Sequence, residues 1–143
     1  MAFVAAPPIA ALYLRTLVLI EDGGVLVPAE ASRLAADGVV HVITAWNPGP
    51  ERPGPDANDA ANGRLRGDLV ARGCEPVRAL GCDPDSDHAE ESWAVRGMTD
   101  EDARALGAAY GQVAVFRIAD GVQTVLACAD TWEVSRRLGA ESG

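Results

Sequence analysis

Apolar residues in the amino-terminal third of the chain form short runs separated by turn residues. Residues 12–20 are rich in Leu and Val, Gly23 and Gly24 supply a turn, and residues 25–27 resume the apolar run, which predicts a β-hairpin. Residues 39–45 are strongly β-branched and predict a third strand. The proline-rich loop that follows excludes regular structure until the next helix begins.

Two later segments have the pattern of longer helices. Asp56 can cap a helix that runs to about Arg72. Thr99, with Asp102 three residues later, resembles a capping box that opens a helix to about Tyr110. We expect these two helices to be the main ones packed on the sheet.

The remaining segments predict further strands and two short helices. The strands are expected over residues 75–82, 91–96, 113–118 and 122–128, and the short helices over residues 28–36 and about 130–139. Hairpins in this number favour a mixed or mostly antiparallel sheet with helices on one side over a doubly wound parallel sheet. We therefore predict an α+β fold with two main helices on the sheet.

The chain length of 143 residues fits one domain, and an apolar content of 48% is ample for a single core. We expect a flexible start over residues 1–11, one α+β domain over residues 12–139 and a flexible end over residues 140–143. The apolar start could be mistaken for a signal peptide, but it lacks a basic leading region and is broken by Pro7 and Pro8. A cytoplasmic protein that does not span a membrane is the expectation.

The formal net charge of -9 disfavours nucleic acid and anionic membranes as partners, because both attract basic proteins. Three cysteines without a close pair favour reduced thiols over a disulfide framework. The acidic segment 83–88 does not match an EF-hand, since His88 and Ala94 stand where the loop needs Gly and Glu. No phosphate-binding glycine loop is found, so neither a metal nor a cofactor is expected.

Six uncharged polar residues lie in, or at the end of, segments that otherwise have the pattern of core. They are Thr44, Asn47, Asn58, Asn62, Ser92 and Gln112. An unpaired polar group in such a place costs about 1–3 kcal/mol, so each residue needs a partner. We predict these six side chains as the ligand-binding residues of one polar site.

Two of these residues belong to the first predicted long helix. Asn58, Asn62, Leu65 and Leu69 are spaced four, three and four, so the two amides continue the stripe that the leucines bury. The alternative is that the amides satisfy free backbone groups or water in the first turns of the helix.

Asn47 and Gln112 also have two interpretations each. Asn47 precedes Pro48, which leaves its side chain free to close the turn after the strand or to contribute to a site. Gln112 follows Gly111 at a helix-to-strand junction, where an amide either ties down the chain or points into a cleft at the strand ends.

Glu90 is the predicted catalytic residue. In a strand, Glu90 and Ser92 share one face while Glu91 and Trp93 share the other. A Glu90 that is partly buried among amides would serve as a general acid or base. The alternative is an exposed charge or a cap on a neighbouring backbone group.

Four short motifs connect these residues to a known family. At ITAWNP, NDAANGRL, the Glu-x-Ser of Glu90 to Ser92, and YGQVAVF, the chain resembles a bacterial family catalogued as domain of unknown function 3293. The order and spacing of the motifs agree over about residues 40–118. The family has no established activity, so the resemblance implies a single domain and the importance of these positions. One departure is Glu91, where the family often carries proline.

Two functions fit these observations. In the first, the amide and hydroxyl side chains bind a small polar molecule, because Asn and Gln offer a donor and an acceptor from one planar group, and Glu90 supplies acid–base catalysis. In the second, the protein is a noncatalytic interaction or regulatory module for a protein partner, and the polar residues form a closed core network. An open cavity lined by Asn58, Asn62, Glu90 and Gln112 would favour the first function.

Overall fold

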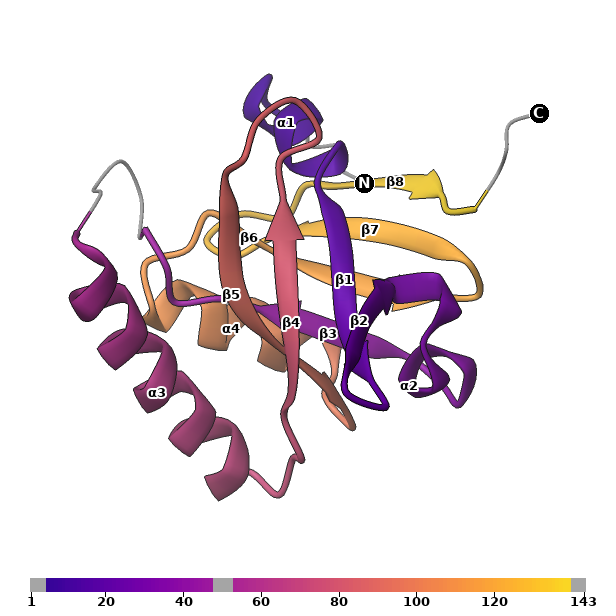
Figure 1. Cartoon of the computed structure of the whole chain (residues 1–143). Helices are drawn as coiled ribbons and strands as arrows, with labels where there is room; N and C mark the ends of the chain where they lie inside the picture. Colours follow the sequence, from indigo (N-terminus) through magenta and orange to yellow (C-terminus); the bar gives the residue numbers. More distant parts are fainter. Residues whose placement is uncertain (1–4, 48–52, 140–143) are drawn as a thin grey trace.

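The computed structural model describes residues 5–47 and 53–139. This part of the chain forms one curled sheet of eight strands in the order β2-β1-β4-β5-β3-β6-β7-β8, with every neighbouring pair antiparallel (Figure 1). The strands are β1 (Leu17–Asp22), β2 (Val25–Pro28), β3 (Val40–Ile43), β4 (Val77–Cys82), β5 (Ala89–Arg96), β6 (Ala114–Ala119), β7 (Val122–Ala127) and β8 (Glu133–Arg137). The helical segments are α1 (Ile9–Leu14), the 3-10 turn η1 (Ala29–Ala31), α2 (Arg33–Ala36), α3 (Pro55–Ala71) and α4 (Asp100–Ala109). The predicted α+β class, with one compact domain and two main helices on the sheet, is confirmed.

The two faces of the sheet have different roles. Helices α3 and α4 pack against one face, which we call the helix face. The buried residues that meet there are Ile43, Ala45, Leu65, Leu69, Val95, Ala103, Leu106, Val115, Leu126 and Cys128. The opposite, inner face curls on itself and buries Val18, Ile20, Ala29, Val40, Val42, Ala79, Ala94 and Ile118. Because side chains alternate between the faces along a strand, the central strands β3, β5 and β6 contribute buried residues to both layers.

Helix α4 begins as the sequence predicts, whereas α3 begins one residue before its predicted cap: Gly54 is the N-cap and Asp56 lies in the first turn without a capping hydrogen bond. Pro55 occupies the first turn of α3, where its missing N–H costs no helical hydrogen bond. The residues that α3 buries are the predicted stripe of Asn58, Asn62, Leu65 and Leu69. At α4 the Thr99 hydroxyl accepts a hydrogen bond from the Asp102 backbone N–H at 3.0 Å.

Replacing Thr99 by alanine is expected to lower the free energy of unfolding by about 1 kcal/mol, because the first turn of α4 then loses its side-chain acceptor. Urea denaturation followed by circular dichroism measures this change. Thr131→Ala, at an exposed threonine outside any helix, is the control. Equal effects of the two substitutions would contradict the capping role.

The start of the chain differs from its prediction. The sequence predicted a flexible segment up to residue 11 and a strand from residue 12, whereas Ile9–Leu14 form helix α1. Pro8 already has helical backbone angles, and Ala10 is buried in a cluster that includes Trp132. Packing on a neighbouring surface has therefore overridden the β tendency of the Leu-rich run.

The end of the chain also differs from its prediction. The sequence predicted a short helix from Asp130, whereas Glu133–Arg137 form strand β8 along the free edge of β7. The available ladder of backbone partners on β7 explains why this segment is extended. The predicted flexible end at 140–143, the first four residues of the predicted flexible start, and 48–52 of the proline-rich loop lie outside the described residues.

Two smaller boundaries also shift. The short helix predicted over residues 28–36 is divided by Ser32, which caps α2 by accepting a hydrogen bond from the Ala35 N–H. Strand β5 begins at Ala89, two residues before its predicted start, which brings Glu90 into the sheet.

Within the described residues no helix has the length and apolar character needed to cross a membrane.

Candidate functional site

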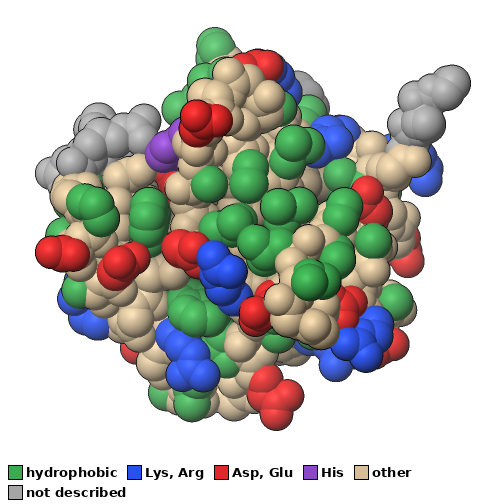
Figure 2. All heavy atoms as spheres, viewed as in Figure 1, with side chains coloured by type: hydrophobic (Ala, Val, Ile, Leu, Met, Phe, Trp, Pro, Cys, Tyr) green, Lys and Arg blue, Asp and Glu red, His purple; other side chains and the backbone are tan. Residues whose placement is uncertain are grey.

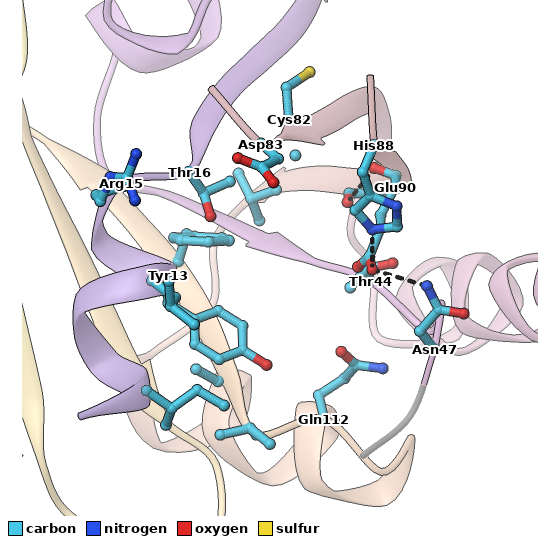
Figure 3. Close-up of a pocket in the computed structure, with 18 of the residues that line it drawn as sticks. Tyr13, Arg15, Thr16, Thr44, Asn47, Cys82, Asp83, His88, Glu90 and Gln112 are labelled. Atoms are coloured by element: carbon cyan, nitrogen blue, oxygen red, sulfur yellow. Dashed lines mark hydrogen bonds and ion pairs between the residues drawn. The ribbon is translucent and has the colours of Figure 1, made fainter. Parts of the chain in front are cut away.

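A cavity of about 560 Å³ opens on the inner face of the sheet (Figure 3). Its walls come from α1 and the residues that connect it to β1, the end of β3, the end of β4, the β4–β5 connection, β5 and the start of β6. A volume of this size is typical of sites for small molecules. The cavity is the candidate functional site.

One end of the cavity is apolar. Ile9, Leu12 and Tyr13 of α1 line it together with Val113 and Phe116 of the β6 region. The rings of Tyr13 and Phe116 contact each other in a tilted arrangement with centroids 6.5 Å apart. This end suits the apolar body of a ligand.

The opposite end of the cavity is polar and is built around the segment that leaves β3. The Ala45 N–H donates to Asn62 Oδ1 at 3.2 Å, and the Asn47 N–H donates to Asn58 Oδ1 at 3.0 Å. Both amides come from α3, and both are at most 5% exposed. They replace the backbone partners that the segment loses when it leaves the sheet.

A third amide secures the same segment from the other side. Gln112 Nε2 donates to the Trp46 carbonyl at 3.1 Å. The Thr44 hydroxyl accepts from the Trp46 N–H at 3.0 Å and donates to the Glu91 carbonyl at 2.7 Å. Side chains from three distant parts of the sequence therefore hold one wall of the cavity in place.

Asn47 connects the buried amides of α3 to Glu90 at the cavity wall. Its backbone is left-handed, with φ 48°, a conformation that asparagine tolerates better than most residues. Asn58 Nδ2 donates to Asn47 Oδ1 at 3.1 Å, which directs Asn47 Nδ2 to Glu90 Oε2 at 3.0 Å. The orientation of both amides is fixed by their partners.

Glu90 has a second partner in His88. The His88 Nε2 atom lies 2.9 Å from Glu90 Oε2, and both side chains line the cavity (Figure 3). The Glu90 side chain is 24% exposed and that of His88 is 45% exposed, so this pair lies where the cavity meets solvent. A carboxylate that orients an imidazole is an arrangement suited to proton transfer.

The structure separates the predicted site residues into two groups. Thr44, Asn47, Glu90, Ser92 and Gln112 line the cavity. Asn58 and Asn62 do not line it, and they support its wall from behind. Their hydrogen bonds to the Ala45 and Asn47 N–H groups match the alternative in which the amides satisfy free backbone groups.

Strand β5 shows why Glu90 faces the cavity. Trp93 lies on the helix face, where its Nε1–H donates to the Asn62 carbonyl at 2.9 Å. Glu91 shares that face and pairs with Arg78 at 2.8 Å. Alternation along the strand then places Glu90 and Ser92 on the inner face.

Sequence reasoning missed His88 and helix α1 as parts of the site. His88 was considered only as part of the acidic segment 83–88, outside the strand predicted from residue 91. A strand starting at Ala89 places His88 and Glu90 two residues apart, where they reach the same side. The signal for α1 was the pair Pro7 and Pro8, which favours the first turn of a helix.

Three further groups line the cavity, namely Arg15, Cys82 and Asp83. Arg15 is paired with Asp85, and both are exposed. Burial raises the pKa of the Cys82 thiol, which keeps it protonated and a poor nucleophile. Hydrogen bonds from the Asp85 backbone N–H and the Ser86 hydroxyl hold the pKa of Asp83 below its ordinary value, so Asp83 carries a negative charge at neutral pH.

The family model described as Protein of unknown function (DUF3293) matches residues 43–115, just over half of the chain. The chain belongs to the DUF3293 family. No curated protein and no solved structure matches this chain.

The DUF3293 match divides the cavity in two. All seven predicted site residues lie within it, together with His88, so it covers the polar end and the amides that support it. Helix α1 lies outside the match and contributes to the apolar end. Within this chain, the polar end is the part that the family model accounts for.

Proposed function

We propose that this DUF3293 protein binds a small molecule in the inner-face cavity. The observation that carries the proposal is the combination of a 560 Å³ space with an apolar end at Tyr13 and Phe116 and a polar end at Glu90 and Gln112. Sites for small molecules combine a mostly apolar lining with a few placed polar groups in this way.

The polar end is organised before any ligand arrives. Asn47, Glu90 and Gln112 each have at least one hydrogen-bond partner that fixes their orientation. Side chains held in this way lose little conformational freedom when they bind a ligand, which favours affinity. Of the four residues that were expected to line an open cavity in a binding protein, Asn58 and Asn62 are buried and hydrogen-bonded, as a structural network requires. Glu90 and Gln112 line the cavity, and this half of the criterion supports binding.

The proposal includes acid–base chemistry by Glu90, with His88 as its positioning partner. The carboxylate lies on the cavity wall and holds the imidazole at 2.9 Å. The Ser92 hydroxyl donates a hydrogen bond to the Glu90 backbone carbonyl at 3.1 Å. A carbonyl is not a general base, so this contact does not activate Ser92 as a nucleophile. Proton transfer is therefore the chemistry that these side chains support best.

A protein-interaction module is the second candidate, and one surface favours it. Leu19 pairs with Leu80 across β1 and β4, and Leu17, which is 46% exposed, lies on the same face. Figure 2 shows hydrophobic side chains gathered over these strands, and in Figure 1 no helix lies in front of them. Exposed apolar surface of this kind is common at protein interfaces.

Filling the cavity is expected to abolish ligand stabilisation. Gly81 lines the cavity, and the nearest atom to a Cβ added there is Thr16 Cγ2 at 3.4 Å, so Gly81→Leu places a side chain in the space without a backbone clash. The measurement is a thermal-shift screen of nucleosides, amino acids, amines and sugars. A ligand at about 100 times its Kd adds about 2.7 kcal/mol of stability.

Gly63→Leu is the matched control, since Gly63 lies on α3 with open space around it. We expect compounds that raise the melting temperatures of the wild type and of Gly63→Leu and do not change the melting temperature of Gly81→Leu. Compounds that stabilise all three proteins equally, or a screen without any stabilising compound, would contradict it.

A further inference from the structure

We infer that the cavity selects ligands whose polar head is a positively charged nitrogen group, such as an amidinium or a primary ammonium. This inference rests on the proposed function and names the class of ligand that the site takes. It follows from counting which hydrogen-bond donors and acceptors at the polar end are already used.

The hydroxyl groups at the polar end have no proton left for a ligand. A hydroxyl has one proton and two lone pairs. The Thr44 hydroxyl donates a hydrogen bond to the Glu91 backbone carbonyl at 2.7 Å, and the Ser92 hydroxyl donates one to the Glu90 backbone carbonyl at 3.1 Å. Thr44 Oγ1 also accepts a hydrogen bond from the Trp46 N–H at 3.0 Å, which leaves it one lone pair. Toward a ligand, both oxygens can therefore act only as acceptors.

The Gln112 side chain also offers an acceptor to the cavity, because its NH₂ group is engaged elsewhere. Its Nε2 donates to the Trp46 carbonyl at 3.1 Å, and the opposite orientation would place two oxygens against each other. Figure 3 shows the Gln112 oxygen directed toward the interior of the cavity. Gln112 is 8% exposed, so this acceptor is well shielded from bulk water.

Glu90 adds a negative charge to these acceptors. Asn47 Nδ2 and His88 Nε2 both contact Oε2, which leaves Oε1 for a ligand. The carboxylate oxygen is the acceptor in both of these hydrogen bonds. Asp83 adds a second carboxylate to the lining, and the lining cation Arg15 is paired with Asp85.

The polar end therefore offers mainly acceptors and negative charge. An anionic or acceptor-rich head group would face these oxygens without a matching donor, and buried polar groups left unpaired cost binding free energy. A nitrogen cation supplies several N–H donors and an opposite charge at once, which gives short and strong hydrogen bonds. Tyr13 and Phe116 at the other end suit an apolar or aromatic body.

Three probes of the same shape test this inference. Benzamidine, benzamide and benzoate share a planar ring and differ in the charge of the head group. Their dissociation constants are measured by ¹H–¹⁵N NMR titration at pH 8. Benzamidine is expected to bind in the cavity at least ten times more tightly than benzamide, and benzoate is expected not to bind there.

Two charge-matched variants separate the cavity from general electrostatics. Glu90→Gln keeps the shape of the side chain and removes its charge, whereas Glu91→Gln removes a charge on the opposite face of the same strand. We expect Glu90→Gln to weaken benzamidine binding at least tenfold and to leave benzamide unchanged. Glu91→Gln is expected to alter neither.

The possible failures of the two proposals are distinguishable. If benzamide or benzoate occupies the cavity as tightly as benzamidine, the inference is wrong while ligand binding in the cavity stands. If benzamidine binds equally to wild type and Glu90→Gln, the inference is also wrong. If none of the three probes shifts cavity signals, the inference is overturned, and the Gly81→Leu screen decides the proposed function by itself.

Discussion

Asn58→Leu is expected to lower the free energy of unfolding by about 2–3 kcal/mol, through the loss of two hydrogen bonds to Asn47. The Asn47 N–H loses its acceptor at 3.0 Å and Asn47 Oδ1 loses its donor at 3.1 Å, in a place where Asn58 is 3% exposed. Buried polar groups left without partners cost about 1–3 kcal/mol each. Guanidinium denaturation monitored by tryptophan fluorescence measures the loss.

Ala60→Leu is the control, because it adds the same side chain at an exposed position of α3. It is expected to change stability by less than about 0.5 kcal/mol. The Asn58→Leu protein is also expected to bind cavity ligands more weakly, since Asn47 no longer has a fixed orientation toward Glu90. Equal stability of Asn58→Leu and Ala60→Leu would contradict the supporting role of Asn58.

Gly107→Ala is expected to destabilise the protein by about 2 kcal/mol, although alanine is the better helix former. A Cβ at Gly107 would lie 2.5 Å from Cys128 Sγ and 2.6 Å from Val115 Cγ1, both packed beneath α4. Overpacking of this kind costs about 1–3 kcal/mol or more and exceeds the gain of about 1 kcal/mol in helix propensity. In a domain of this size the melting temperature falls by about 3–4 °C per kcal/mol.

Gly67→Ala supplies the opposite result in a matched position. Gly67 lies in α3 with nothing within 4 Å of an added Cβ, so alanine there is expected to raise stability by about 0.5–1 kcal/mol. Adding Cys128→Ala to Gly107→Ala removes the closest contact and is expected to restore part of the lost stability. Stabilisation by Gly107→Ala alone would show that α4 does not pack as closely as described.

The sequence predicted the fold where local patterns and final packing agree. The stripe of α3, the Thr99 cap of α4 and the β6–β7 hairpin are each readable within a few residues of chain, and each is confirmed. The predictions failed at α1 and β8. There the final state depends on a distant surface, the cluster around Trp132 for α1 and the edge of β7 for β8.

The candidate site divides along similar lines. The sequence marked Thr44, Asn47, Ser92 and Gln112 as polar residues in costly positions and Glu90 as the catalytic candidate, and the structure brings these five together around one cavity. The sequence could not show that Asn58 accepts a hydrogen bond from the Asn47 N–H and that Gln112 donates one to the Trp46 carbonyl, because these contacts join segments far apart in the chain. It also could not pair His88 with Glu90 until the start of β5 was known.

The central claim is that the inner-face cavity beside α1 is the binding site. A crystal structure of the protein soaked with the most stabilising compound of the thermal-shift screen tests this claim most directly. The predicted result is a compound whose apolar part contacts Phe116 and whose head group lies beside Glu90 and Gln112 Oε1. An empty cavity, with the compound on the exposed apolar face around Leu19 and Leu80, would contradict it.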